Sequence, residues 1–131
     1  MIAHDRRGHG RSDLTDIGND MDRYAQDVFE FVAHLDLQNA VHIGHSTGGG
    51  EVACYAARAE NGRITKAALL GAVPPNMLQT AANPDGINRD GADVKLGMIN
   101  DRWRQSMIGG AQAHYDCIAA FSETDFSDDL K

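Results

Sequence analysis

Residues 40–50, Ala-Val-His-Ile-Gly-His-Ser-Thr-Gly-Gly-Gly, constrain the fold of this chain more than any other stretch. A run with strand character leads into Gly44-His45-Ser46-Thr47-Gly48, and helix-forming residues follow from Glu51. Gly-x-Ser-x-Gly between a strand and a helix is typical of a nucleophile elbow, in which a strained turn exposes the serine hydroxyl. The pattern predicts Ser46 as a nucleophile. The alternative is a glycine-rich turn without chemistry, such as a phosphate cradle.

Composition narrows the class of protein further. The chain of 131 residues has a hydrophobic share of 42%, enough for one domain with a core. Its net charge of −7 argues against nucleic acid or an anionic membrane as a partner. No apolar run approaches the roughly 18 residues of a membrane span, and no signal peptide is expected. Cys54 and Cys117 lack metal-ligand spacing, which predicts reduced, buried thiols in a cytoplasmic protein without metal or cofactor.

Hydrophobic patterns predict an α/β fold. An apolar stripe over residues 21–35 predicts a helix capped by Asn19 or Asp20. The nucleophile strand (40–44), a helix (51–59) and an apolar run (67–73) follow, the run being typical of a buried parallel strand. Their order predicts a short parallel sheet flanked by helices.

The ends of the chain give weaker patterns. Residues 1–4 are compatible with a very short strand, and residues 83–86 form a strong turn signal. Residues 94–121 indicate a largely helical segment, and the tail from residue 122 is expected to be loose or marginally helical. The positions expected to be buried in the helical segment are Trp103, Met107, Ile108 and Ile118.

A loop rich in arginine follows the first segment. Arg6, Arg7 and Arg11 are suited to steering an acidic substrate. Arginines in such a loop more often contact solvent or nearby carboxylates, and surface charge contributes little to stability. We therefore expect solvated or paired arginines.

Four motifs in this order indicate a family. They are residues 4–12 (His-Asp-Arg-Arg-Gly-His-Gly-Arg-Ser), the elbow through Glu51, residues 71–75 (Gly-Ala-Val-Pro-Pro), and residues 114–126 beginning His-Tyr-Asp-Cys-Ile. Together they resemble the cofactor-free bacterial haloperoxidases, α/β-hydrolases that act as arylesterases and perhydrolases. The resemblance spans nearly the whole chain. It implies one truncated domain over 1–131, with a core over 1–75 and a shortened cap with a C-terminal helix over 76–131.

The resemblance also implies that parts of the enzyme lie outside this chain. In that family a strand pair and a loop with one oxyanion donor precede the motif at His4. The catalytic aspartate and histidine follow the region of Phe126. A serine needs a base, and the base needs an orienting acid. The backbone N–H of Thr47 is expected to supply one oxyanion donor.

The candidate bases come from the six histidines of the chain. His45 belongs to the serine's own turn, His34 is expected to be solvated on a helix, and His42 is expected to be buried in the nucleophile strand. That leaves His4, His9 and His114.

Two classes of function follow. The first is a serine hydrolase that acts on small carboxylic esters through Ser46, with a substituted base or parts from another subunit, and with perhydrolase or haloperoxidase-like side activity. The second is a non-catalytic fragment or binding module of the same fold. The intact nucleophile favours the hydrolase. Unpaired strand edges at 40–44 and 67–73 predict a homo-oligomer, with segment exchange as one route, unless Met1–His4 moves sideways to pair with the nucleophile strand.

Overall fold

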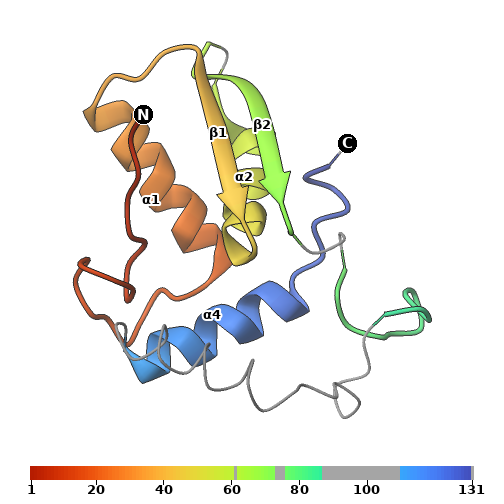
Figure 1. Ribbon diagram of the computed structural model, residues 1–131. Coiled ribbons are helices and arrows are strands. Elements are labelled where there is room, and N and C mark those ends of the chain that lie inside the picture. Colours follow the sequence, from red (N-terminus) through yellow and green to blue (C-terminus); the bar gives the residue numbers. More distant parts are fainter. Residues whose placement is uncertain (61, 73–75, 87–109, 131) are drawn as a thin grey trace.

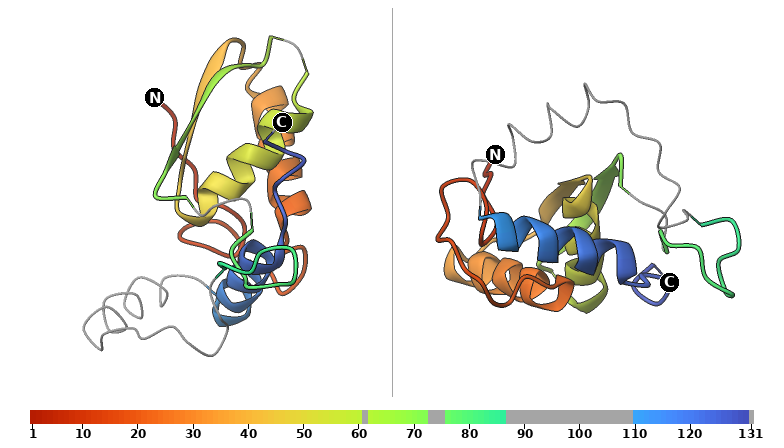
Figure 2. Two further views of the ribbon diagram at one scale, coloured as in Figure 1. Left: turned by 90° about the vertical axis from the view of Figure 1, so that its right-hand side faces the viewer. Right: turned by 90° about the horizontal axis from the view of Figure 1, so that it is seen from below.

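The computed structural model describes residues 1–60, 62–72, 76–86 and 110–130. β1 and β2 form a two-stranded parallel sheet, and α1 and α2 both lie behind it (Figures 1 and 2). This arrangement confirms the predicted α/β class with a short parallel sheet flanked by helices. The elements, in order, are α1 (Met21–His34), β1 (Ala40–His45), α2 (Thr47–Arg58), β2 (Ile64–Leu70) and α4 (Ala111–Glu123).

Helix α1 forms where its apolar stripe predicts. Of the two candidate caps, Asp20 is the one used, because its carboxylate accepts the backbone N–H of Arg23 at 2.8 Å. Leu35, at the end of the stripe, is 43% exposed. The rest of the stripe faces the core. Each large apolar side chain that is fully buried there stabilises the fold by about 1.5–3 kcal/mol. The buried stripe residues are Met21, Tyr24, Ala25, Val28 and Val32.

Strand β2 begins three residues before the predicted position. The N–H of Asn39 donates to Gly62 O at 2.7 Å and the N–H of Ala40 to Arg63 O at 3.1 Å, so the pairing starts beside Ile64. The expectation of a buried strand is wrong, since Leu69 and Leu70 are 41% and 53% exposed. Both helices lie behind the sheet, and no other described element covers its front face (Figure 2).

Residues 1–4 do not form the predicted strand. They run alongside β1 in the same direction (Figure 1), but within the described ranges none of their backbone groups makes a hydrogen bond. A strand requires a hydrogen-bonded neighbour. The prediction of a strand at residues 1–4 is therefore wrong, because the segment does not lie close enough to β1 to pair with it.

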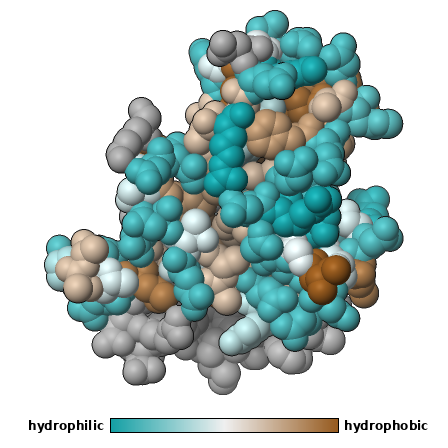
Figure 3. All heavy atoms as spheres, turned by 180° about the vertical axis from the view of Figure 1, so that it is seen from behind, coloured by the Kyte–Doolittle hydropathy of each residue, from teal (hydrophilic) through white to brown (hydrophobic). Residues whose placement is uncertain are grey.

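The core lies between α1, α2 and α4. Tyr24, Cys54 and Tyr55 are its largest fully buried side chains. Both cysteines are free and buried, as predicted. The surface on the helix side of the sheet, seen from behind, is mostly hydrophilic (Figure 3). None of the helices in the described part is long and apolar enough to cross a membrane.

The C-terminal region departs from the sequence predictions. Phe126 is 4% exposed in a tail predicted to be loose, and it packs where a Cβ on Gly50 would lie 2.7 Å from its Cζ. Ile118, predicted to be buried, is 62% exposed because it lies on the outer side of α4. The turn at 83–86 is present, with the N–H of Gly86 donating to Asn83 O at 3.1 Å. Trp103, Met107 and Ile108 lie outside the described residues.

Candidate active site

Ser46 occupies a strained turn between β1 and α2. Its φ of 54° and ψ of −124° lie in a region that residues with a Cβ rarely adopt. Two backbone hydrogen bonds hold the turn: the N–H of Ser46 donates to Leu70 O at 3.0 Å, and the N–H of Gly49 donates to Ser46 O at 2.9 Å. The predicted strand–turn–helix geometry is therefore present. The serine's role as nucleophile stays a prediction.

The glycine before the turn has a steric reason. A Cβ on Gly44 would collide with the carbonyl group of Gly48, because the strand and the helix pass each other at this point. At Gly48 itself, a Cβ would lie 3.3 Å from Nη2 of Arg6. The elbow is thus packed against the N-terminal segment as well as against its own helix.

The first residue of α2 places a backbone donor beside the serine. Thr47 begins the helix, so its N–H has no acceptor within the helix. Such a donor, at the positive end of the helix dipole, is suited to stabilise an oxyanion. This is the position expected for one oxyanion donor, and the assignment remains a prediction.

The candidate bases lie in two separate places. His4 contacts Glu51, with 3.4 Å between Nε2 and Oε1, whereas His9 and His114 contact each other. In the part of the chain that the structure describes, no side chain hydrogen-bonds to the hydroxyl of Ser46. The three histidines therefore do not meet at the nucleophile.

His4 belongs to an ion-pair cluster behind the elbow. Glu51, 5% exposed, contacts His4 on one oxygen and Arg6 on the other, with 3.3 Å between Arg6 Nε and Oε2. The hydrogen bond to Glu51 raises the pKa of His4, although burial acts in the opposite direction. Arg6 also lies over the ring of Tyr24, 4.9 Å from its centroid, and Nη1 donates to Cys117 Sγ at 3.2 Å. The cluster joins the N-terminal segment to α1, α2 and α4.

The second histidine pair joins the arginine loop to α4. The rings of His9 and His114 meet edge to face, with centroids 4.4 Å apart, and His9 Nδ1 lies 2.9 Å from Arg7 O. The N–H of Gly110 donates to Gly8 O at 3.0 Å, so the loop and the start of α4 are held together.

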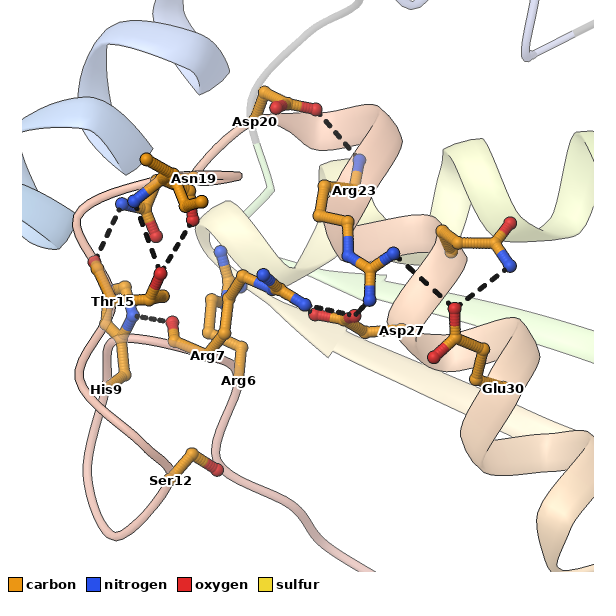
Figure 4. Close-up of polar contacts among 12 residues, drawn as sticks. Arg6, Arg7, His9, Ser12, Thr15, Asn19, Asp20, Arg23, Asp27 and Glu30 are labelled. Atoms are coloured by element: carbon orange, nitrogen blue, oxygen red, sulfur yellow. Dashed lines mark hydrogen bonds and ion pairs between the residues drawn. The ribbon is translucent and has the colours of Figure 1, made fainter.

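The arginine loop is paired rather than free. Arg7 makes a two-point contact with Asp27, which also pairs with Arg23 at 2.8 Å (Figure 4). Arg6 pairs with Glu51 in the same way. The expectation that the arginines of this loop pair with nearby carboxylates is therefore confirmed for Arg6 and Arg7. Arg11 is exposed, and its backbone N–H donates to Asp5.

Of the other histidines, His34 is exposed as expected, whereas His42, expected to be buried, is half-buried. His45 is exposed as well. The ring of His42 lies 4.7 Å from that of Tyr55, and burial, followed by repulsion from His4, lowers its pKa. No group of three or more metal-ligating side chains occurs within the described ranges.

Sequence reasoning missed the role of Glu51. It entered only as the last residue of the elbow motif. The available signal was a carboxylate placed directly after three glycines, in the first half of a helix rich in glycine and alanine. Its function as the partner of both His4 and Arg6 depends on the tertiary fold.

Comparison with known proteins agrees with this geometry. A family model described as the alpha/beta hydrolase fold matches residues 1–95. A non-heme chloroperoxidase of Streptomyces lividans is 52% identical, and a bifunctional esterase/perhydrolase of Acinetobacter calcoaceticus is 47% identical. Each alignment covers 100% of this chain and 59% of the relative. The resemblance to haloperoxidases is thereby confirmed.

Solved structures show the same fold. A bromoperoxidase from Bacillus anthracis, 32% identical, superposes with a TM-score of 0.81 over 96% of this chain and 57% of its own. An esterase from Exiguobacterium antarcticum, 24% identical, gives a TM-score of 0.79. The chain therefore spans about three fifths of the relatives it matches. The alignments extend over 162 residues, more than the 131 of this chain, so the relatives also carry residues without a counterpart inside the matched region.

Proposed function

The chain belongs to the α/β-hydrolase fold family, and from this premise we propose that it provides the nucleophile of a serine hydrolase acting on small carboxylic esters. The observation that carries the proposal is the strained conformation of Ser46, with φ of 54°. Strain of this kind persists where the surrounding structure holds it, and it clusters at functional sites. The esterase/perhydrolase relative, 47% identical, supports the ester as substrate.

The proposed reaction has two steps. The Ser46 hydroxyl oxygen attacks the ester carbonyl while a base takes its proton. The C–O bond to the alcohol then breaks, the alcohol leaves with the proton, and an acyl-serine remains. Water hydrolyses the acyl-serine and restores the hydroxyl. The backbone N–H of Thr47 would stabilise the oxyanion of both steps. Perhydrolase activity would replace the water with hydrogen peroxide.

The base is the open part of the mechanism. His4 has the better chemical surroundings of the three candidates, since a carboxylate that contacts a histidine orients the ring and favours its protonated form. His9 or His114, in place or across a subunit boundary, remains the alternative. Hydrolysis by the three His→Ala variants distinguishes them, and three unimpaired variants would remove all three from the mechanism.

A second function has an observation in its favour. Within the described residues, no side chain hydrogen-bonds to the Ser46 hydroxyl, which suits a binding module that has the fold but not the complete chemistry. Losing triad members typically leaves only the activity supplied by the oxyanion site and substrate binding.

One experiment separates the two functions. Hydrolysis of p-nitrophenyl acetate is measured for the wild type and for Ser46→Ala, together with labelling by a serine-directed phosphonate. The hydrolase proposal expects turnover and labelling that both depend on Ser46. Equal rates for the two proteins, with no label on Ser46, would leave the binding module as the function.

We further propose that the chain self-associates, as its open strand edges predict. Apolar side chains on the sheet support this: Val41, Ile43 and Leu69 are 57%, 64% and 41% exposed. Contiguous exposed apolar surface is typical of protein–protein contact. Light scattering at micromolar concentration tests the proposal, and a stable monomer would contradict it.

A further inference from the structure

The guanidinium group of Arg6 lies directly against the elbow that carries Ser46. A Cβ on Gly48, two residues after the serine, would lie 3.3 Å from Arg6 Nη2. Apart from the adjacent residues and the backbone of α2, no other atom in the described part lies within 4 Å of that Cβ position. The space left by the missing side chain at Gly48 is therefore occupied by Arg6.

The same guanidinium is attached to α2 at a second point. Its Nε lies 3.3 Å from Oε2 of Glu51, a buried carboxylate. Gly48 and Glu51 are three positions apart in α2, so they lie on one face of the helix. Arg6 thus contacts two points of the N-terminal part of α2, which begins with Thr47 and follows Ser46 directly.

The other contacts of Arg6 are with the remaining helices. Its Cζ lies 4.9 Å from the ring centroid of Tyr24 in α1, and Nη1 donates to Sγ of Cys117 in α4 at 3.2 Å. Tyr24 and Cys117 are both buried. One side chain therefore connects the start of α2 to the core formed by α1 and α4.

The preference of helices for charge does not explain this position. The N-terminus of a helix carries a partial positive charge, so a cation beside its first turn is unfavourable. Glu51 neutralises Arg6, although this requires a second buried charge. A residue that departs from a local preference in this way is expected at functional sites.

We infer that Arg6 is a positioning residue for the nucleophile. It fixes the start of α2 against the core, and it thereby maintains the positive φ of Ser46 and the direction of the Thr47 N–H. A strained conformation persists only where the surrounding structure holds it. The inference rests on the proposed role of Ser46 in ester hydrolysis, and it gives Arg6 no contact with the ester.

Arg6→Lys tests the inference, with Arg7→Lys as its matched control. Lysine retains the positive charge but lacks the planar fork that contacts three helices at once. Arg7 belongs to the same loop and makes a two-point contact with Asp27 of α1 (Figure 4). None of the polar contacts of Arg7 in the described part is with α2. A merely structural role of Arg6 would make the two variants behave alike.

Amide hydrogen exchange measured by NMR gives a first readout that requires no activity. The N–H groups of Ser46 and Gly49 donate the two hydrogen bonds that hold the turn. In Arg6→Lys their exchange should become roughly tenfold faster or more, relative to the amide of Tyr55 in the second half of α2. In Arg7→Lys this ratio should remain that of the wild type.

Hydrolysis of p-nitrophenyl acetate gives the second readout. Arg6→Lys should lower kcat roughly tenfold to a hundredfold, because a displacement of about 1 Å can slow a reaction by that factor. KM should stay within about twofold, since Arg6 does not bind the ester. Unchanged kcat with faster exchange would show a structural role only and would overturn the inference. A shifted pH profile of kcat would also overturn it, because the effect would then act through His4, which shares Glu51.

Gly48→Ala tests the same contact without removing the ion pair, and it serves if Arg6→Lys does not fold. The added Cβ displaces Arg6 Nη2, so kcat should fall and exchange at Ser46 should rise, each roughly threefold to tenfold. Gly48→Ala and Arg6→Ala should be non-additive, because the second substitution leaves the space open.

Two results would refute the inference directly. The first is an equal effect of Arg6→Lys and Arg7→Lys on exchange at Ser46 and Gly49. The second is additivity of Gly48→Ala and Arg6→Ala. A wild type without Ser46-dependent hydrolysis would refute the proposed function instead, and the exchange ratios would still decide whether Arg6 holds the turn.

Discussion

Replacing Glu51 by alanine should destabilise the protein strongly, because Glu51 is a buried carboxylate in helix α2 that contacts two other side chains. Its side chain is 7% exposed and contacts both His4 and Arg6, whose side chains are 40% and 14% exposed. Glu51→Ala therefore leaves Arg6 as a nearly buried cation without its carboxylate. Solvent screens the contact to His4, so most of the loss comes from Arg6.

The expected loss is about 3 kcal/mol in the free energy of unfolding, the lower end of the range for breaking a buried ion pair. The lower end applies because Arg6 retains its contact with the ring of Tyr24. The control is Asp22→Ala. Asp22 pairs with Arg58, but their side chains are 78% and 47% exposed, so the loss should stay below about 1 kcal/mol.

Urea unfolding followed by circular dichroism measures both variants, with the midpoint and the slope fitted separately. A small domain has only about 5–15 kcal/mol of total stability, so the Glu51 variant should unfold at a clearly lower urea concentration. Arg6→Ala and the double variant complete a cycle that isolates the pair. A Glu51→Ala loss no larger than that of Asp22→Ala would refute the argument that burial makes this pair important.

Three smaller predictions follow from the same structure. Gly44→Ala should lose roughly 1–3 kcal/mol of stability, together with any Ser46-dependent esterase activity, because its Cβ meets the carbonyl of Gly48; unchanged unfolding and activity would contradict this. Glu51 raises the pKa of His4, so the stability from their contact is complete below pH about 6.5 and is lost as the pH rises through the raised value. The effect is below about 1 kcal/mol because His4 is 40% exposed, and a wild-type stability profile unchanged by His4→Gln would refute it. Asp20→Ala should cost about 1 kcal/mol through loss of the helix cap, measured by thermal unfolding, whereas Asp20→Asn should cost little.

Several features could be predicted from the sequence because they depend only on residues close in the chain. The stripe at 21–35 and a cap at Asn19 or Asp20 predicted α1, because helix periodicity and capping depend on neighbours within a few residues. The glycines around Ser46 predicted the elbow for the same reason, since the collision that excludes a Cβ at Gly44 is with a carbonyl only four residues away. The reduced cysteines followed from their number and spacing.

Positions that depend on distant partners were predicted less well. The start of β2 at Ile64 is set by the pairing of Arg63 with Ala40, not by the apolar run that follows. Residues 1–4 have strand-like composition but no neighbour to pair with in the described part. Burial of Phe126 depends on the space above Gly50, which a pattern in the tail alone does not reveal.

The sequence by itself thus predicted the elbow, the first helix and the α/β class, because glycine spacing, helix capping and hydrophobic periodicity are patterns among residues close in the chain. Only the tertiary structure decided how the histidines are grouped. His4 joins Glu51 and Arg6, and His9 joins His114, because side chains 45 to 105 positions apart come together only when the helices pack. The same packing leaves a cavity between residues 1–4 and β1, so residues 1–4 do not pair with the strand, since backbone hydrogen bonds form only where a second strand lies at the right distance.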